Sequence, residues 1–198
     1  MSNAQEALPA LEEYWFTYLT PQELPLVQTL CEQCARELEQ TAHLQPGLSL
    51  EHVLGLPPGS SLAQELALAL PAGKGYEDKL LLGIFARPQQ LVGVLDAIRD
   101  YPVQGEWWLG LLLLEPAQRG RGLGENICRA FEQWAKNAGA RYLRLVVSVQ
   151  NRRGHQFWQR MGFEELERRV RKLSDGQGSE AIIMGHPLIS VMEYNFVS

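Results

Sequence analysis

The chain has 198 residues, of which 45% are hydrophobic and 21% charged, a composition typical of an ordinary globular protein with one sizeable domain. Its net charge of −5 argues against broad nucleic-acid binding, which normally needs a basic surface. No apolar run approaches the roughly 18 residues of a membrane-spanning helix, and the N-terminus lacks the basic start and apolar stretch of a secretory signal. We therefore expect a cytoplasmic protein with neither a nucleic-acid nor a membrane partner.

The first forty residues predict a strand followed by a helix. Residues 14–18, Tyr-Trp-Phe-Thr-Tyr, are typical of a strand. Residues 20–23, Thr-Pro-Gln-Glu, have the form of a helix-capping box with proline at the first helical position. Apolar residues then recur every four positions, which extends the helix to about Gln40. A second helix is expected at residues 61–70, within a stretch (residues 41–78) that carries no recognisable motif.

The three cysteines are Cys31, Cys34 and Cys128. The Cys31-x-x-Cys34 pair lies inside the predicted helix, with no second pair and no histidine at zinc-finger spacing. We interpret it as two reduced cysteines of a helix rather than a redox or metal site, and we expect no metal. This cysteine usage fits a reducing cytoplasm.

From residue 79 onward the pattern is mainly that of strands, interrupted by one strong helix. The helix is expected at residues 123–138, where apolar residues share one face and Gly139 supplies the C-terminal cap. The expected strands are residues 80–86, 91–99, 107–114, 141–149, 164–173 and 181–186, the last two joined by a hairpin loop at 174–178. Strands before and between helices predict an α/β domain with a mixed sheet.

The most informative stretch is Arg119-Gly120-Arg121-Gly122-Leu123-Gly124, between a predicted strand and the predicted helix at 123–138. The first N–H groups of a helix have no partner within it, and the helix dipole adds partial positive charge there, so an anion such as a phosphate is favoured. The spacing is not that of a P-loop, because neither Lys nor Ser/Thr follows Gly124, and it is not the dinucleotide order G-x-G-x-x-G. A tight turn that uses glycine only for its geometry is the alternative.

The order R-x-x-G-x-G resembles the acetyl-CoA pyrophosphate loop of the GCN5-related N-acetyltransferases (GNAT). Residues 151–163 are similar to the second half of the same family's core: an asparagine after a strand, a short helix with the aromatic pair Phe157-Trp158, and then Gly162-Phe163. The two motifs occur in the family's order, and the helix expected at 123–138 lies between them.

This resemblance implies an α/β (α+β) fold in which residues 1–198 form a single GNAT-like domain, with a mixed, mainly antiparallel central sheet flanked by helices. The cofactor-binding core is expected at about 107–163 and an acceptor-shaping region at about 20–78. The implied activity is transfer of an acetyl group from acetyl-CoA to the primary amine of a small molecule, with coenzyme A as product. A protein lysine or N-terminal acetyltransferase and a non-catalytic acetyl-CoA-binding domain are the alternatives, and a homodimer stays open.

The resemblance also implies which residues bind acetyl-CoA. They are Leu112, Leu113 and Leu114 through their backbone, Arg119, Gly120, Arg121, Gly122, Leu123 and Gly124 of the loop, and Asn151, Phe157 and Trp158. Either loop arginine could instead be a solvated charge, and Asn151 could instead form a local turn.

The family usually has tyrosine as the second aromatic residue of Phe157-Trp158, where it serves as the general acid for the thiolate. An indole N–H donates a hydrogen bond but gives up no proton, so Trp158 cannot replace it. The thiolate of coenzyme A is stable enough to leave unaided. Tyr101, Tyr142, Ser148 and His155 are the substitutes that the sequence offers.

The general base is expected among the carboxylates of the central strands, with Asp96 and Glu106 as equal candidates. Asp96 interrupts the apolar run 91–98, and by strand periodicity it would share a face with Asp100. Glu106 begins the strand that leads to the cofactor. Burial would have to raise the pKa of such a carboxyl for it to act near neutral pH, and the alternative for Asp96 is an ion pair with an arginine such as Arg99 or Arg144.

Overall fold

The computed structural model describes residues 8–9, 11–40, 70–87, 90–172 and 178–189. Its centre is a sheet of seven strands in the order β1-β2-β3-β4-β5-β7-β6. The strands are β1 (Trp15–Tyr18), β2 (Lys79–Arg87), β3 (Gln90–Ile98), β4 (Glu106–Leu114), β5 (Tyr142–Ser148), β6 (Glu164–Lys172) and β7 (Gly178–Pro187). All neighbours are antiparallel except β4 and β5, which run parallel. The predicted mixed, mainly antiparallel sheet is therefore confirmed.

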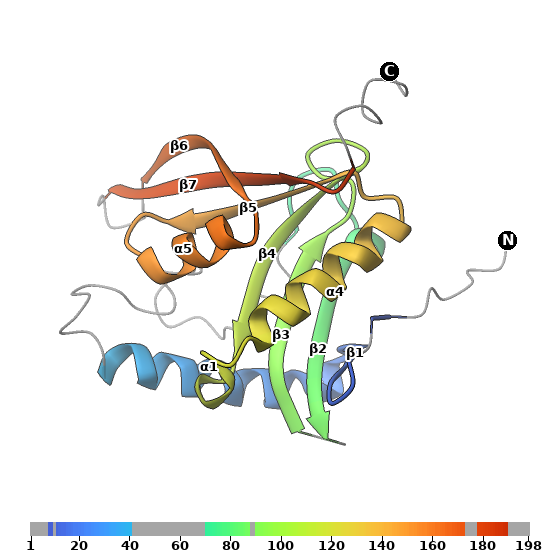
Figure 1. Cartoon of the computed structure of the whole chain (residues 1–198), viewed down its shortest axis with the longest axis vertical. Coiled ribbons are helices and arrows are strands. Elements are labelled where there is room, and N and C mark those ends of the chain that lie inside the picture. The colour runs from blue at the N-terminus through green and yellow to red at the C-terminus, as the bar shows by residue number, and fades with distance from the viewer. Residues whose placement is uncertain (1–7, 10, 41–69, 88–89, 173–177, 190–198) are drawn as a thin grey trace, which may run out of the picture.

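Helices cover both faces of this sheet (Figure 1). The α-helices are α1 (Leu24–Gln40), α4 (Leu123–Asn137) and α5 (Arg152–Arg160), with short 3-10 turns η1 (Pro21–Glu23), η2 (Tyr76–Asp78) and η3 (Pro116–Gln118). Helices α4 and α5 lie on one face, and α1 lies on the other. Among the described residues, no helix is both long and apolar enough to cross a membrane.

The capping box predicted at residues 20–23 is present. Thr20 caps the η1 turn, and the side chain of Glu23 accepts a hydrogen bond of 2.7 Å from the Thr20 N–H. The 3-10 turn leads directly into α1, so this helix begins two residues before the predicted apolar pattern. The second helix predicted at 61–70 lies, apart from Leu70, outside the described residues, as do residues 174–177 of the predicted hairpin loop.

Two apolar clusters hold the layers together. The larger one joins α4 to the sheet and includes an aromatic group in which the rings of Trp107 and Trp134 meet edge to face with centroids 5.7 Å apart. The smaller one joins α1 to β3 and β4 and contains both Cys31 and Cys34, which are free thiols. Burial raises the pKa of Cys31 to about 12, so its thiol stays protonated at neutral pH.

Candidate active site

Strands β4 and β5 pair only over their first halves. Their parallel register runs from Glu106 opposite Tyr142 to Leu109 opposite Leu145. Beyond that point β5 continues to pair with β7, and β4 continues to pair with β3. The edges of β4 and β5 that face one another after Leu109 and Leu145 therefore have no strand partner in the described sheet. An extended ligand that contains amides can hydrogen-bond to such an edge as an added strand would.

A β-bulge lies where the two strands separate. Ala97 of β3 is opposite Leu109, but Asp96 is opposite Leu111, so Gly110 is the extra residue of β4. The bulge reverses the alternation of side chains: Leu109 packs in the α4 cluster, whereas Leu111 packs in the α1 cluster. A Cβ atom at position 110 would lie 2.7 Å from Oδ2 of Asp96, so only glycine fits beside that carboxylate.

The glycine turn before α4 has the geometry that an anion site requires. Gly120 and Gly122 have φ of 74° and 82°, and Gly122 is the N-cap residue of α4. The first hydrogen bond within the helix runs from the Asn126 N–H to the Gly122 carbonyl at 3.1 Å, so the N–H groups of residues 123–125 have no acceptor inside the helix. A Cβ atom on Gly120 or Gly122 would meet nothing within 4 Å, so the turn faces open space. These features fit a pyrophosphate group.

The two arginines of the turn have different surroundings. Arg119 donates a hydrogen bond of 2.9 Å from Nε to the Leu114 carbonyl, and its Nη2 lies 3.1 Å from Sγ of Cys34, so it ties the end of β4 to α1. Arg121 is exposed. The geometry thus favours a structural role for Arg119 and leaves Arg121 as the arginine available to a phosphate.

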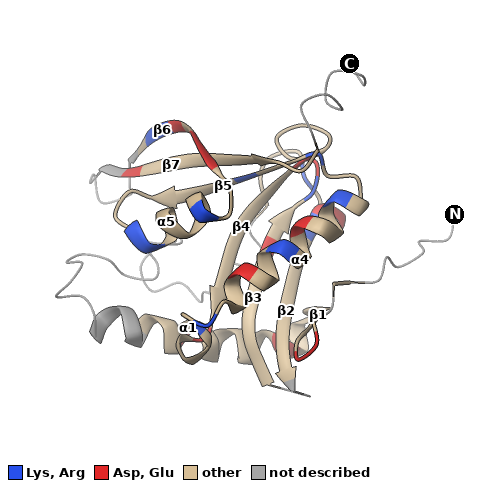
Figure 2. Ribbon diagram, viewed as in Figure 1, with Lys and Arg blue, Asp and Glu red and all other residues tan. Residues whose placement is uncertain are grey.

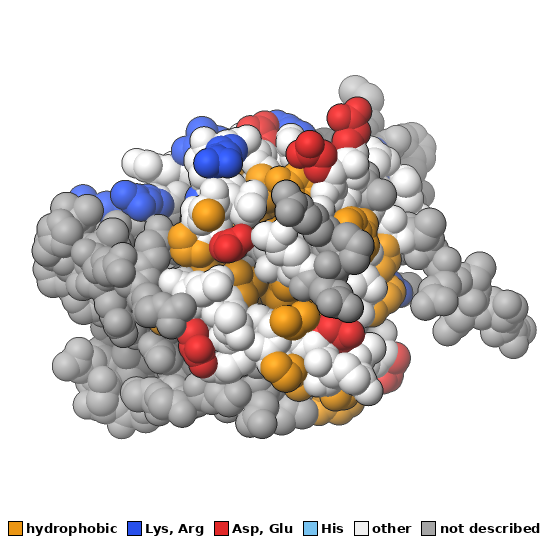
Figure 3. Space-filling view, turned by 90° about the horizontal axis from the view of Figure 1, so that it is seen from below, with side chains coloured by type: hydrophobic (Ala, Val, Ile, Leu, Met, Phe, Trp, Pro, Cys, Tyr) orange, Lys and Arg blue, Asp and Glu red, His pale blue; other side chains and the backbone are white. Residues whose placement is uncertain are grey.

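Basic residues also lie on α5, the helix whose Phe157 packs near Gly124. Helix α5 carries Arg152 and Arg153 at its start and Arg160 at its end (Figure 2). In the view from below, most of the basic side chains that can be seen gather toward the upper left edge of the molecule (Figure 3). A chain with a net charge of −5 thus keeps local positive charge where an anionic cofactor is expected.

Helix α5 places the predicted aromatic pair close to the turn. A Cβ atom on Gly124 would lie 3.5 Å from the Phe157 ring and 3.4 Å from Leu114, so these three residues meet at the start of α4. Trp158 is half-buried against the core, edge to face with Phe157 at 4.8 Å between centroids and with Phe163 at 5.2 Å. The aromatic pair is therefore a packed part of the core.

Asn151 is the N-cap of α5. Its Oδ1 accepts a hydrogen bond of 2.9 Å from the Gly154 N–H, which is the local turn that the sequence offered as the alternative to cofactor binding. The side chains of Leu112, Leu113 and Leu114 pack in the two apolar clusters, and their backbone lies on the edge of β4 that has no strand partner. Contact of these residues with acetyl-CoA stays a prediction.

Asp96 lies beside the bulge and pairs with a lysine. Lys79 Nζ donates to Oδ1 at 2.7 Å, and the two side chains are only 5% and 11% exposed, respectively. The expected alternative, an ion pair with an arginine, is wrong because the antiparallel register brings the first residue of β2 diagonally next to Asp96. Burial raises the pKa of the Asp96 carboxyl, and the ammonium of Lys79 partly offsets that rise.

The predicted shared face of Asp96 and Asp100 is also wrong. Strand β3 ends at Ile98, and Asp100 lies in the following turn with φ of 51°. Its Oδ1 accepts a hydrogen bond of 2.6 Å from the Gly105 N–H, so it stabilises that turn. A single residue in the left-handed region ends the strand periodicity on which the prediction depended.

Glu106 has a different environment from Asp96. Both of its carboxylate oxygens accept hydrogen bonds from the Arg144 guanidinium, one of them at 3.2 Å. It lies at the start of β4, where β4 and β5 are still paired. The structure therefore separates the two candidate bases: Asp96 is next to the divergence of the strands, and Glu106 is held by an arginine before it.

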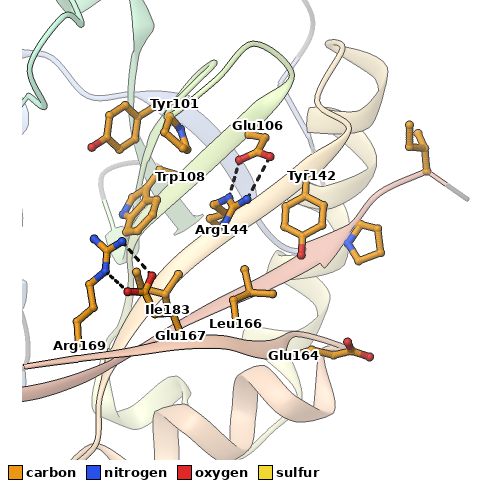
Figure 4. Close-up of a pocket in the computed structure, with 13 residues that line it drawn as sticks. Tyr101, Glu106, Trp108, Tyr142, Arg144, Glu164, Leu166, Glu167, Arg169 and Ile183 are labelled. Carbon is orange, nitrogen blue, oxygen red and sulfur yellow. Dashed lines mark hydrogen bonds and ion pairs between the residues drawn. The ribbon is translucent and has the colours of Figure 1, made fainter. Parts of the chain in front are cut away.

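Glu106 and Arg144 belong to the wall of a pocket of about 740 Å³ (Figure 4). The pocket is formed by the first halves of β4 and β5, by β6 and β7, and by the turn that carries Tyr101. Tyr101 and Tyr142, two of the proposed substitute acids, line it. Of the other two, Ser148 ends β5 and is buried, and His155 Nε2 on α5 lies 2.8 Å from a carboxylate oxygen of Glu165.

Sequence reasoning missed Lys79, Gly110 and the pocket residue Trp108, and it named Arg144 only as a possible partner of Asp96 rather than of Glu106. One of these had a signal, because an isolated glycine inside an apolar strand, as in Leu109-Gly110-Leu111, is typical of a bulge. Lys79 and Arg144 had no such signal in the sequence. Only the strand register brings Lys79 to Asp96 and Arg144 to Glu106.

Comparison with known proteins adds to this geometry. Residues 59–163 match the model of the acetyltransferase (GNAT) family, which is more than half of the chain. The chain belongs to the GNAT family. The family is one of acetyltransferases, and it implies acetyl-CoA as the acetyl donor. The resemblance of residues 119–124 and 151–163 is thereby confirmed at the level of the family.

Individual GNAT relatives are distant. An uncharacterized N-acetyltransferase of Methanocaldococcus jannaschii is 38% identical over 56 residues, which are 28% of this chain and only a quarter (25%) of that protein's length. A probable GNAT acetyltransferase from Chromobacterium violaceum has a similar structure, with a TM-score of 0.70, 18% identity and coverage of 98% of this chain and 91% of that one. The ribosomal-protein-S18-alanine N-acetyltransferase from Escherichia coli has a TM-score of 0.60 and 17% identity, over 90% of this chain and 96% of that one. At these identities the solved structures show the GNAT fold alone.

Proposed function

We propose that this GNAT protein transfers an acetyl group from acetyl-CoA to the primary amine of a small molecule. The observation that carries the proposal is the position of Asp96: its buried carboxylate lies beside Gly110, where β4 loses β5 as its partner. The glycine turn before α4 supplies an anion site on the same β4–α4 unit. The same β4–α4 unit thus carries a candidate anion site after the end of β4 and a candidate proton acceptor beside the bulge of β4.

When bound, acetyl-CoA supplies a thioester with an electrophilic acyl carbon. The N–H groups at the start of α4, together with Arg121, would hold its pyrophosphate. The unpaired edge of β4, through the backbone of residues 112–114, would hold its amide-containing arm, and β4 N–H groups would donate to the developing oxyanion. Phe157 packs at the start of α4 and supports the turn from behind.

The acceptor arrives as an ammonium ion and must lose a proton before its nitrogen can attack. Asp96 is proposed to accept that proton, directly or through one water, while the new C–N bond forms and the C–S bond breaks. Both carboxylates are in ion pairs, but Arg144 binds both oxygens of Glu106 and lies where β4 and β5 are still paired, whereas Lys79 binds Oδ1 of Asp96 and Oδ2 faces Gly110 at the bulge. Glu106 is therefore the weaker candidate. Burial raises the pKa of Asp96, which makes it a stronger base than an ordinary carboxylate, and the charge of Lys79 partly offsets that rise.

The thiolate leaves without a proton from Trp158, since an indole cannot act as an acid. The packing of Trp158 between Phe157 and Phe163 supports a role in shaping the site through contact area. We propose that no side chain replaces the usual tyrosine.

The test is an amine panel assayed by thiol release from acetyl-CoA, with the acetylated product identified by mass spectrometry. A small primary amine is expected to be acetylated, and Asp96→Asn is expected to lower turnover by about 100-fold or more near neutral pH. The defect should shrink as pH rises and free amine becomes abundant. Acetylation of protein N-termini or lysines without any small amine would favour the protein-modifying alternative. Acetyl-CoA binding without transfer to either class would favour the non-catalytic one.

A further inference from the structure

The pocket of about 740 Å³ lies on the face of the sheet opposite α4. On β4, Trp107 and Leu109 pack in the cluster beneath α4, so Trp108 between them points to the other side. On β5 the same alternation places Tyr142 and Arg144 opposite the buried Leu143. The pocket therefore shares its sheet face with α1, and this is the face on which Asp96 lies.

The alternation of β3 fixes the position of Asp96 relative to the pocket. Ile98 is the cross-strand partner of Trp108, and Asp96 lies two residues from Ile98 on the same face. Two residues of a strand span about 7 Å. Asp96 lies outside the lining of the pocket, so an amine held against Trp108 would have to extend past Ile98 to reach it, over a span that two or three carbons and a hydrogen bond can cover.

Three aromatic side chains stand in the wall of the pocket, among charged and aliphatic ones. The rings of Tyr101 and Trp108 meet edge to face with centroids 5.9 Å apart, and they form one side of the pocket (Figure 4). Tyr142 lies on the far side, with the Arg144 guanidinium 5.3 Å from its ring centroid. Aromatic faces of this kind bind flat apolar groups, and their negative quadrupoles also attract cations.

The charges of the pocket favour a cation over an anion. Three carboxylates line it and only two guanidinium groups do. Arg144 is paired with Glu106, and Arg169 is paired with Glu167 at 2.8 Å. Within the described residues, Glu164 makes no ion pair, so the lining carries one carboxylate in excess.

We propose that this pocket is the acceptor subsite, and that it takes a primary amine in which an aromatic ring is joined to the ammonium group by a short alkyl chain. The ring would lie against Trp108 and Tyr101, beside the Glu106–Arg144 ion pair that separates Trp108 from Tyr142, and the amine would reach toward Asp96. This inference rests on the proposed function, because it names the class of acceptor for the same reaction. The inference goes beyond the proposed function because it says which group the amine carries, an aromatic ring, in addition to its primary nitrogen.

The experiment compares two amines that differ in the ring alone, 2-phenylethylamine and ethylamine. The wild type is expected to show at least about a tenfold higher kcat/KM for 2-phenylethylamine. In Trp108→Ala this ratio is expected to fall at least about tenfold. Trp15→Ala is the matched control, because Trp15 is a half-exposed tryptophan of β1 outside the pocket, and it should leave the ratio unchanged.

Calorimetric titration without acetyl-CoA separates this inference from the proposed function. We expect 2-phenylethylamine to bind the wild type more tightly than phenylacetate, which has the ring but an anionic end. Equal kcat/KM for the two amines, or a ratio unchanged by Trp108→Ala, would contradict the proposed acceptor subsite. Neither result would contradict the proposed acetyltransferase activity. Binding of 2-phenylethylamine that needs Trp108 but gives no thiol release would overturn the activity and leave the subsite. If Trp108→Ala does not fold, Tyr101→Ala carries the same comparison with Tyr76→Ala as its control.

Discussion

The ammonium group of Lys79 and the carboxylate of Asp96 form an ion pair of 2.7 Å that is almost completely buried between β2 and β3. Removing two charges from water is unfavourable, and replacing such a pair by apolar residues is often neutral or stabilising. Removing only one partner is costly, because the other charge then stays buried without compensation. Burial of this ion pair beside the bulge at Gly110 is therefore not explained by stability alone. It supports a catalytic role for Asp96.

Stability and activity should separate in variants of this pair. Lys79→Met alone is expected to lower the free energy of unfolding by about 3–5 kcal/mol, because it leaves the Asp96 carboxylate uncompensated. Lys79→Met combined with Asp96→Leu should recover most of that loss in urea denaturation and still show no amine acetylation. A double variant with full turnover would exclude Asp96 as the base.

The pH dependence of kcat/KM identifies which carboxylate is the base. A base is active when ionised, so the rate falls as pH falls through its pKa in the folded protein. Burial raises the pKa of Asp96 above its ordinary value of 3.8, so the acid limb should lie above the usual carboxyl range. Lys79→Met removes the positive charge that lowers the pKa of Asp96. The acid limb of the kcat/KM profile should therefore move to higher pH. Arg144→Met is the control: a shift in that variant alone would identify Glu106 instead.

The sequence predicted most of the elements and the cofactor half of the site, because both depend on local patterns. The helix predicted at 123–138 is α4 to within one residue, and the glycine turn has the positive φ angles that its residues suggested. The pairing of Lys79 with Asp96 and of Arg144 with Glu106 could not be predicted, because each pair is set by strand register between distant segments. Asp100 was misplaced because one turn residue ended the periodicity.

The glycine turn can be tested with a matched pair of substitutions. Gly122 and Gly73 both have φ of 82°, and a Cβ atom on either would meet nothing within 4 Å. Valine at either position should therefore cost a similar free energy of unfolding, about 1–2 kcal/mol, from backbone strain. Only Gly122→Val is expected to abolish acetyl-CoA binding in calorimetry, because its side chain would occupy the space in front of the α4 N-terminus. Unchanged acetyl-CoA affinity in a folded Gly122→Val would refute the loop assignment.

The two arginines of the turn should differ in what they support. Arg121→Gln is expected to weaken acetyl-CoA binding by about tenfold and to reduce its dependence on salt, with little change in stability, because this side chain makes no hydrogen bond or ion pair within the described residues. Arg119→Gln removes the hydrogen bond to the Leu114 carbonyl and should mainly lower stability, by about 1–2 kcal/mol. Calorimetry at two salt concentrations and thermal unfolding measure both effects, and a reversed pattern would assign the phosphate contact to Arg119.

Trp158 provides the test of a reaction without a side-chain acid. Phenylalanine keeps an aromatic face against Phe157 and Phe163 but has no N–H, so Trp158→Phe is expected to retain most of kcat. Trp158→Ala removes the packing as well, and should lower both stability, by about 3 kcal/mol, and acetyl-CoA affinity. Rapid-mixing measurement of thiol release separates the chemical step from cofactor binding. A loss of several orders of magnitude in Trp158→Phe at unchanged acetyl-CoA affinity would show that the indole N–H takes part in the reaction, and the unaided departure of the thiolate would then have to be abandoned.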